Sequence, residues 1–434
     1  MHAVIVAVPD AHGAMLPISA RVAGLPVLLR AALAFASRGA TRLLVVHRPE
    51  DAAAAAFALT DARLSVPVEL VPVAAIGSVP ALLAARLSSA ASSGDAASRC
   101  DAASRSELAE PFLFARHDCI VDPGLYARVA AVDADGCRAP SSRVVVDGGV
   151  ALGVARLTLS ALELVGANGE LAALARQGGV EQLELAPSWA VDARTLAGRR
   201  EAVRRLFLAC RKPVDGVVSR HLNRYVSLFI SRQLVETRVT PNAMTAFTFS
   251  LAIAAAVFAA RGGYVSVLAA AVLMQLNSIL DGCDGELARV RYQGSKVGQW
   301  LDTVGDDASN VLFWAALGYG ARSEAHGEWL AAAGYASSAA NALAAALNYV
   351  LLARLGSGDF YALTEGAPAR RAGIQGGVVR ALELILKQDF FKLLLVALAL
   401  LGVLEQALAV FVVGALITLG SSLARFLRRY RMKT

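Results

Sequence analysis

The 434-residue sequence predicts a multidomain protein with an N-terminal α/β domain and a C-terminal all-α domain of six transmembrane helices. The first part alternates apolar strand-like and helical stretches, and the second part contains long apolar runs. Hydrophobic residues make up 56% of the chain and charged residues 18%, a balance that fits a protein partly in water and partly in a membrane. The net charge of +7 favours binding to anionic lipids or anionic substrates. The sequence lacks the basic stripe interleaved with aromatic residues that would indicate nucleic-acid binding.

The N-terminal domain is expected over residues 1–195. Two apolar segments, Ala3–Val8 and Arg42–His47, are predicted strands, and Leu25–Arg38 between them is a predicted helix. Together they form a βαβ unit, which requires parallel strands. Residues 88–107, rich in Ser, Ala and Asp, are expected to form a surface insertion. Further strands are predicted at Val68–Val71, Phe112–Ala115 and Val144–Val154.

This layout resembles the sugar-phosphate nucleotidyltransferase fold, a Rossmann-type α/β architecture. The supporting residues are Gly24-Leu-Pro26 before the first helix and Phe112-Leu-Phe-Ala-Arg-His-Asp118. The fold implies a Gly-rich loop whose Arg and Lys hold a nucleoside triphosphate. The corresponding loop here, Pro9–Pro17, has one glycine and neither cation, so we expect a catalytically inactive domain. Asp118 is either a remnant of a metal-binding aspartate or an ordinary residue at a strand end.

A connector with an interfacial helix is predicted over residues 196–238. Pro213 ends the preceding helix, and an amphipathic pattern rich in Arg follows as far as Arg224. Such a helix would lie on the bilayer with its cations at lipid phosphates. Alternatively, these cations hold an anionic substrate.

The membrane domain is expected over residues 239–434, and several of its apolar stretches are rich in Ala and Gly, which favours close helix packing. The six predicted spans are 242–260, 264–288, 298–319, 328–353, 389–404 and 406–425.

Four aspartates stand at helical spacing within two of these spans. Asp281 and Asp284 are three residues apart, and Asp302 and Asp306 are four apart, so each pair shares one helix face. Carboxylates at membrane depth are costly, and two adjacent helices would direct all four into one pocket. Hard divalent cations, Mg²⁺ or Mn²⁺, would compensate their charge, and a pair of such ions can bind the oxygens around a reacting phosphorus.

Small residues and one cation lie on the same helix faces as the aspartates. Gly285, Ala288 and Gly298 leave room for a phosphate to approach. Arg289 would neutralise a diphosphate from the side. The whole pattern is Asp281-x2-Asp284-Gly285-x2-Ala288-Arg289-x8-Gly298-x3-Asp302-x3-Asp306.

This pattern resembles the signature of the CDP-alcohol phosphotransferase family and matches each of its fixed positions. The resemblance implies an integral membrane enzyme that displaces CMP from a CDP-alcohol with the hydroxyl of a second alcohol. Metal ligands would be Asp281, Asp284 and Asp302, with Asp306 a further ligand or the general base. The nucleotide diphosphate would be lined by Gly285, Ala288, Gly298 and Arg289, and the catalytic roles would fall to Asp302, Asp306 and Arg289.

A second family element opens the first span. Thr240 or Asn242 can cap this helix and Pro241 suits its first position, so capping alone would explain these residues. The family also has a Pro-Asn-x-x-Thr element here, which implies that Asn242 and Thr245 lie near the cytidine.

The combination of both parts resembles the subgroup that joins an inositol-phosphate cytidylyltransferase domain to a di-myo-inositol-phosphate-phosphate synthase domain. It implies a CDP-inositol-like donor and an acceptor such as inositol phosphate. One alternative is phospholipid synthesis from CDP-diacylglycerol with inositol phosphate or glycerol phosphate as acceptor. Another is a non-catalytic membrane sensor of a nucleotide or sugar phosphate. The resemblance also implies contact with membrane lipids and formation of a homodimer.

The distribution of Lys and Arg predicts the topology. Cations are concentrated in the loops on one side of the predicted spans and at the C-terminus, with little beyond Arg261 and Arg322 on the other side. We therefore expect a multi-pass protein of the cell inner membrane, with the N-terminal domain and the active site on the cytoplasmic side.

Overall fold

A computed structural model of the chain describes residues 2–9, 15–74, 112–130, 142–147, 150–157, 180–211, 215–323, 327–358, 360–363 and 388–431. It divides into two compact units, Met1–Ala209 and Cys210–Thr434. The predicted connector, residues 196–238, falls across this boundary.

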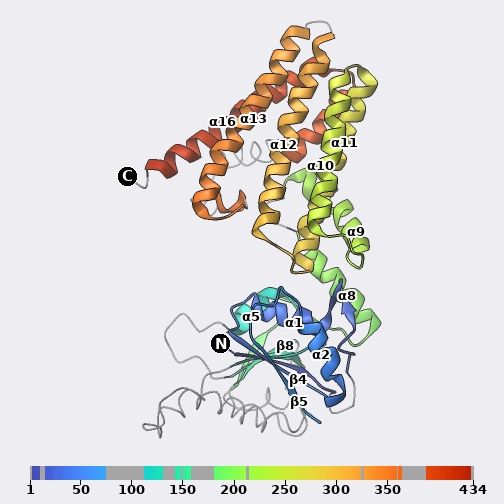
Figure 1. Cartoon of the computed structure of the whole chain (residues 1–434), viewed down its shortest axis with the longest axis vertical. Helices are drawn as coiled ribbons and strands as arrows, with labels where there is room; N and C mark the ends of the chain where they lie inside the picture. The colour runs from blue at the N-terminus through green and yellow to red at the C-terminus, as the bar shows by residue number, and fades with distance from the viewer. Residues whose placement is uncertain are drawn as a thin grey trace. The chain divides into compact units, whose positions relative to one another are not determined.

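The first unit is built on a seven-stranded sheet with the strand order β10-β8-β9-β6-β1-β4-β5 (Figure 1). Strand β1 pairs in parallel with both β4 and β6, which confirms the predicted βαβ unit. Among the pairings within this sheet, those of β9 are antiparallel, so the sheet is mixed. Its strands are β1 His2–Ala7, β4 Arg42–His47, β5 Val68–Pro72, β6 Phe112–Arg116, β8 Arg143–Asp147, β9 Val150–Leu157 and β10 Glu181–Glu184.

The central strands are apolar along most of their length because they are buried on both faces. Val4 and Val6 of β1, Val46 of β4 and Phe114 of β6 form one core with neighbouring strands. The other elements of this unit are β2 Arg21–Val22, β3 Leu25–Pro26, α1 Val27–Ala36, η1 Pro49–Asp51, α2 Ala52–Leu59, β7 Cys119–Val121, α5 Pro123–Ala130, β11 Ala190–Asp192 and α8 Leu196–Leu208.

The prediction of one strand over Val144–Val154 was wrong. The region holds β8 and β9, which pair antiparallel with each other. Gly148-Gly149 separates them in the sequence, and such a pair favours a turn. The sequence analysis also missed the short strands β2, β3, β7, β10 and β11, and the predicted helix Leu25–Arg38 is shorter in the structure because Leu25–Pro26 pair as β3 and α1 ends at Ala36. The predicted insertion at 88–107 lies outside the described residues.

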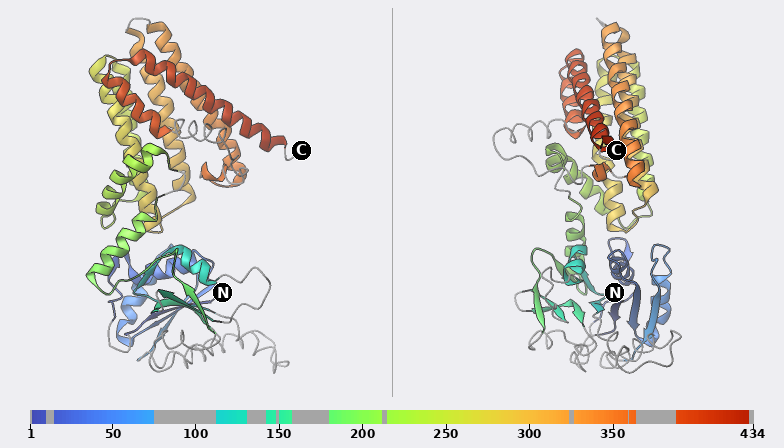
Figure 2. Two further views of the ribbon diagram at one scale, coloured as in Figure 1. Left: turned by 180° about the vertical axis from the view of Figure 1, so that it is seen from behind. Right: turned by 90° about the vertical axis from the view of Figure 1, so that its left-hand side faces the viewer.

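The second unit is a bundle of long helices, and α10, α11, α12 and α13 lie side by side in each view (Figures 1 and 2). Small residues allow close approach: a Cβ added at Gly318 of α12 would lie 2.9 Å from the Ala331 carbonyl oxygen of α13. The helices are η3 Ser219–Asn223, α9 Arg224–Leu234, α10 Pro241–Arg261, α11 Tyr264–Val290, α12 Lys296–Gly320, η4 Ala321–Ser323, α13 Gly327–Leu355, η5 Phe360–Leu363, α15 Gln388–Leu400 and α16 Leu404–Arg431.

Five of the six predicted spans are helical throughout, and the span 389–404 is helical only as far as Leu400, because residues 401–403 form a turn before α16. Four helices within the described part of the chain are long and apolar enough to cross a membrane. Helix α12 contains three aspartates, and α15 has only 13 residues, so neither meets both conditions. The number six therefore remains a prediction. The four qualifying segments are Pro241–Arg261, Tyr264–Val290, Gly327–Leu355 and Phe411–Arg429.

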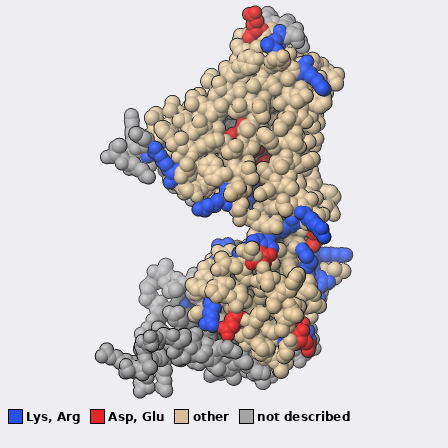
Figure 3. Space-filling model, in the orientation of Figure 1, with Lys and Arg blue, Asp and Glu red and all other residues tan. Residues whose placement is uncertain are grey.

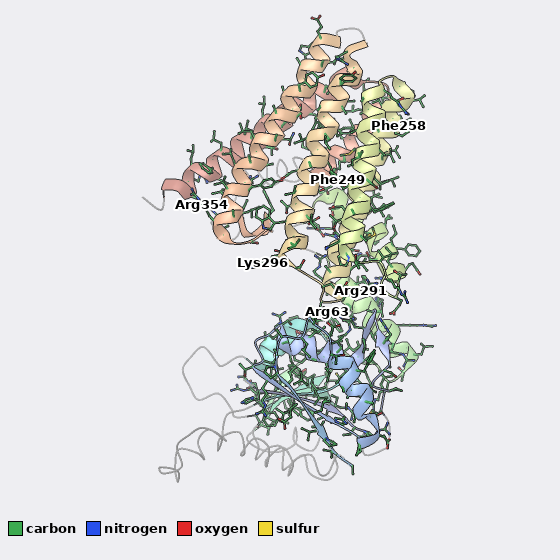
Figure 4. All side chains as sticks on the ribbon, in the orientation of Figure 1. Arg63, Phe249, Phe258, Arg291, Lys296 and Arg354 are labelled. Atoms are coloured by element: carbon green, nitrogen blue, oxygen red, sulfur yellow. The ribbon has the colours of Figure 1, made fainter. Side chains whose placement is uncertain are left out.

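The surface of this unit fits a membrane protein. The face shown in Figure 3 is largely uncharged, with a few acidic atoms visible in its middle. Arg291 and Lys296 mark one end of the bundle, and Phe258 marks the opposite end of α10 (Figure 4).

The pre-membrane helix α9 and the π-helical turn η3 before it are amphipathic. Tyr225 and Phe229 are 58% and 63% exposed, while Asn223, Ser227 and Ser231 on the other side are buried. The buried side packs on α11. This division agrees with the interfacial helix expected from the sequence.

Candidate functional site

Three carboxylates from two helices converge in the bundle. Asp281 and Asp284 lie on α11 and Asp302 lies on α12. One carboxylate oxygen from each lies within 4.8 Å of the others, which is compatible with shared coordination of a cation. The predicted juxtaposition of the two helix faces is present.

Asp306 belongs to the same region. It lies one turn after Asp302 on α12, and its charge acts on both Asp281 and Asp284. The adjacent Asp307 instead accepts a hydrogen bond from Tyr349 of α13. The periodicity of α12 thus separates two sequential aspartates into different surroundings.

The start of α10 completes one wall of the site. Thr240 caps the helix, its hydroxyl accepting from the Ala243 amide at 3.2 Å. One turn later, the Thr245 hydroxyl donates to Asp284 Oδ2 at 2.5 Å. The backbone amide of Gly285 donates to the other oxygen of Asp284. Thr245 therefore orients a carboxylate of the cluster.

The predicted nucleotide-lining residues lie on the same helices as the aspartates. A Cβ added at Gly298 would lie 3.4 Å from Asn242 Oδ1, so Gly298 of α12 faces Asn242 at the start of α10. A Cβ added at Gly285 would lie 3.1 Å from Arg289 Nη1, so the guanidinium lies over Gly285. Ala288 continues the same face of α11. The positive charge of Arg289 acts on Asp284.

The electrostatic state of the cluster is unusual for a buried site. Within the part of the chain that the structure describes, neither Asp281 nor Asp284 forms an ion pair, although Asp284 is only 6% exposed. The cations that act on them, Arg289 and Lys392, do so without a salt-bridge contact. Clustered anions in this state favour a bound cation.

A separate polar network holds the opposite face of α11. Arg224 of α9 donates to Glu286 Oε1 at 2.9 Å and to both oxygens of Asp215 at 3.0 and 3.2 Å. Burial would lower the pKa of the Arg224 guanidinium, but the hydrogen bond and charge of Asp215 and the charge of Glu286 raise this pKa overall. Ser227 also donates to Glu286, at 2.7 Å. The connector is thereby fixed to the helix that carries Asp284.

Sequence reasoning missed three further polar contacts in this unit. Asp389 of α15 accepts from the Ser219 amide at 2.7 Å. Arg291 is buried and donates to backbone carbonyls of the α9–α10 connection, so it is a structural anchor and not only a topology signal. Lys392 is buried on α15 and donates to Asn277. The available signal for Lys392 was a charged residue inside the otherwise apolar predicted span 389–404.

In the first unit, Asp118 is neutralised. Its two oxygens accept from Arg116 Nε and Nη2 at 3.0 and 2.9 Å. His117 beside it is buried, with Nε2 2.8 Å from the Leu16 carbonyl oxygen, and burial lowers the pKa of its imidazole. Most of the loop Pro9–Pro17, residues 10–14, lies outside the described residues.

Part of the chain is similar to known proteins. Residues 238–374 match the family described as CDP-alcohol phosphatidyltransferase. A bifunctional IPC transferase and DIPP synthase of Thermococcus kodakarensis is 47% identical over 110 residues, 25% of this chain and 24% of that protein. The protein of the same description from Aquifex aeolicus is 38% identical over 145 residues, 33% of each chain. Inner membrane protein YnjF of Escherichia coli is 35% identical over 107 residues, 24% of this chain and 48% of that protein.

The similarity thus spans about a quarter to a third of the two bifunctional relatives. Among solved structures, a putative glucose-1-phosphate thymidylyltransferase from Bacillus anthracis is 11% identical, with a TM-score of 0.32 over 46% of this chain and 93% of that one. HddC from Yersinia pseudotuberculosis is 12% identical, with a TM-score of 0.33 over 47% of this chain and 99% of that one.

Proposed function

We propose that this membrane protein is a CDP-alcohol phosphotransferase, because residues 238–374 match the CDP-alcohol phosphatidyltransferase family. It would transfer the phospho-alcohol group of a CDP-alcohol to the hydroxyl of an acceptor alcohol and release CMP. The observation that carries the proposal is the convergence of Asp281, Asp284 and Asp302 within 4.8 Å.

The carboxylates fit the divalent metal that the family uses. All donors are hard oxygens, which suit Mg²⁺ or Mn²⁺, and the family resemblance makes two ions our expectation. Asp281, Asp284 and Asp302 would hold the metal, with Asp306 as a further ligand or as the base. When bound, the metal supplies charge stabilisation to phosphate oxygens.

The residues of the site then perform the transfer. Gly285 and Gly298 admit the diphosphate, and Arg289 balances its charge. Asp306 orients the acceptor hydroxyl and takes its proton. The acceptor oxygen bonds to the phosphorus that carries the alcohol, and the bond from this phosphorus to the bridging oxygen breaks. That oxygen leaves with CMP.

The substrate proposal follows the relatives. Two proteins described as bifunctional IPC transferase and DIPP synthase are 47% and 38% identical over the shared segment, which supports a CDP-inositol-like donor and an inositol phosphate acceptor. CDP-diacylglycerol with inositol phosphate or glycerol phosphate is the alternative. We propose that the cytidine binds near Asn242 and Gly298, which lie close together.

The remaining assignments complete the proposal. The N-terminal domain is catalytically inactive, because its loop Pro9–Pro17 contains neither Arg nor Lys. A separate enzyme must then supply the CDP-alcohol. The protein lies in the inner membrane with its active site toward the cytoplasm, as the distribution of Lys and Arg favours. The family resemblance is the basis for proposing a homodimer.

Purified protein in detergent tests the proposal. Incubation with CDP-inositol or CDP-diacylglycerol and each acceptor, with and without Mg²⁺, should release CMP only with metal, and mass spectrometry of the product identifies both substrates. Asp281→Ala and Asp306→Asn should abolish CMP release while the protein remains folded. Normal turnover in either variant would refute the assigned roles.

A further inference from the structure

A buried lysine lies beside the carboxylate cluster. Lys392 of α15 is 7% exposed, and its charge acts on Asp281 of α11. It stands beyond residues 238–374, the segment that matches the family. An ammonium group is expensive to bury in the membrane, so its position calls for a compensating role.

A second buried residue holds this lysine in one place. Asn277, one turn before Asp281 on the same face of α11, is 2% exposed and accepts from Lys392 Nζ at 3.1 Å. The orientation of the Asn277 amide is itself set, because its nitrogen donates to the Thr248 carbonyl oxygen of α10 at 2.9 Å. Three helices therefore position one ammonium group.

The ammonium has hydrogen-bonding capacity left. It carries three donors, and Asn277 is its one hydrogen-bond acceptor among the described residues. The charge of the site also requires a second cation. Two divalent ions would balance the four aspartates, and the two negative charges of a bound diphosphate would then be balanced by Arg289 and Lys392.

We propose that Lys392 is the second cation of this site and binds an anionic phosphate oxygen of the substrate. Without ligand, its positive charge partly compensates the negative charge of Asp281. With ligand, its remaining N–H groups donate to the phosphate. The identity of the anion as a diphosphate rests on the proposed function, whereas the location of the cation does not.

Binding of Mn²⁺ alone to the purified full-length protein tests the location. Lys392→Gln removes the charge and retains an amide donor, so Mn²⁺ should bind about tenfold more tightly. Lys392→Arg should bind Mn²⁺ as the native protein does. Arg261→Gln is the matched control, since it removes a cation at the other end of α10, about 24 Å from Thr245 along the helix, and should shift affinity less than about twofold.

Binding of inorganic pyrophosphate to the Mn²⁺-loaded protein tests the ligand. Lys392→Gln should weaken pyrophosphate binding at least about tenfold, and Lys392→Arg should retain most of it. A purely structural lysine would lower both affinities together, so opposite shifts support the proposal. Unchanged or weaker Mn²⁺ binding in Lys392→Gln overturns the location, and unchanged pyrophosphate binding overturns the contact. If Lys392→Gln does not fold, Lys392→Met is measured under the same criteria.

The two proposals fail separately. Absence of CMP release from the native protein would refute the proposed function. The opposite shifts in Mn²⁺ and pyrophosphate affinity would still be expected. If the native protein releases CMP but Lys392→Gln binds Mn²⁺ and pyrophosphate with unchanged affinity, only the role of Lys392 is refuted.

Discussion

The two units treat buried carboxylates in opposite ways. In the α/β unit, Asp118 is 2% exposed and both of its oxygens are bound by Arg116. In the helical unit, Asp284 is 6% exposed and accepts from the Thr245 hydroxyl and a backbone amide, with no ion pair among the described residues. A neutralised carboxylate has little capacity for a ligand, whereas an uncompensated group of carboxylates requires one.

Helix α11 repeats this contrast within one element. Glu286 is fully buried and paired with Arg224, yet it lies only two residues from Asp284. The difference is the helix face: one side packs on the connector and the other meets α12. Burial alone therefore does not identify the site; burial without compensation does.

Removing one buried carboxylate from each unit should change CMP release very differently. Asp284→Asn should lower CMP release by at least about 10²–10³-fold, because it removes a charged ligand from the reaction centre. Asp118→Asn should leave CMP release unchanged, since that carboxylate only neutralises Arg116. Initial rates of CMP formation at saturating Mg²⁺ measure both. Comparable losses in the two variants would break the comparison.

A smaller effect tests the paired face of α11. Arg224→Leu should lower the free energy of unfolding by about 3–5 kcal/mol, because Glu286 and Asp215 are left buried without their cation. The double variant Arg224→Leu with Glu286→Leu should recover part of that loss, since one uncompensated charge is gone. Thermal unfolding midpoints in detergent provide the measurement. A double variant no more stable than Arg224→Leu alone would contradict the assignment.

The third prediction, with the smallest change, concerns how the stability of the α/β unit depends on pH. Burial lowers the pKa of His117 below its usual value of about 6.5, so the folded unit favours the neutral imidazole. The unfolded chain binds a proton at higher pH than the folded one does. The contribution of neutral His117 to the free energy of unfolding is therefore complete above about pH 6.5. As pH falls toward the pKa of His117 in the folded state, the free energy of unfolding decreases by at most about 1.4 kcal/mol per pH unit.

Amide hydrogen exchange in β1 and β6 at pH 7 and pH 5 would measure this loss. His117→Gln is the control, because it removes the titrating group, and its protection should depend less on pH between these values. Equal pH dependence in the native protein and the variant would exclude His117 as the cause.

Much of the candidate site was predictable because helical periodicity is a local property. The spacings of Asp281 with Asp284 and of Asp302 with Asp306 place each pair on one face whatever else the chain does. The βαβ unit was predictable for a similar reason, since the periodicity changes at Leu25 and again at Arg42. The residue roles at the site remain predictions until the variants are measured.

Other features depend on contacts between distant segments. Lys392 and Asn277 are 115 residues apart, and Arg224 and Glu286 are 62 apart, so no local pattern joins them. The division of Val144–Val154 into two strands depends on antiparallel pairing, which apolar content alone does not specify.

The order of residues is enough to specify which side chains share a helix face, because the backbone geometry of a helix repeats at a constant interval. Which helix faces contact each other depends on how the helices pack. Packing placed Arg224 against Glu286 and brought Asp302 to Asp281 and Asp284. Charge compensation depends on distance in space, and this distance is set by the way the helices pack.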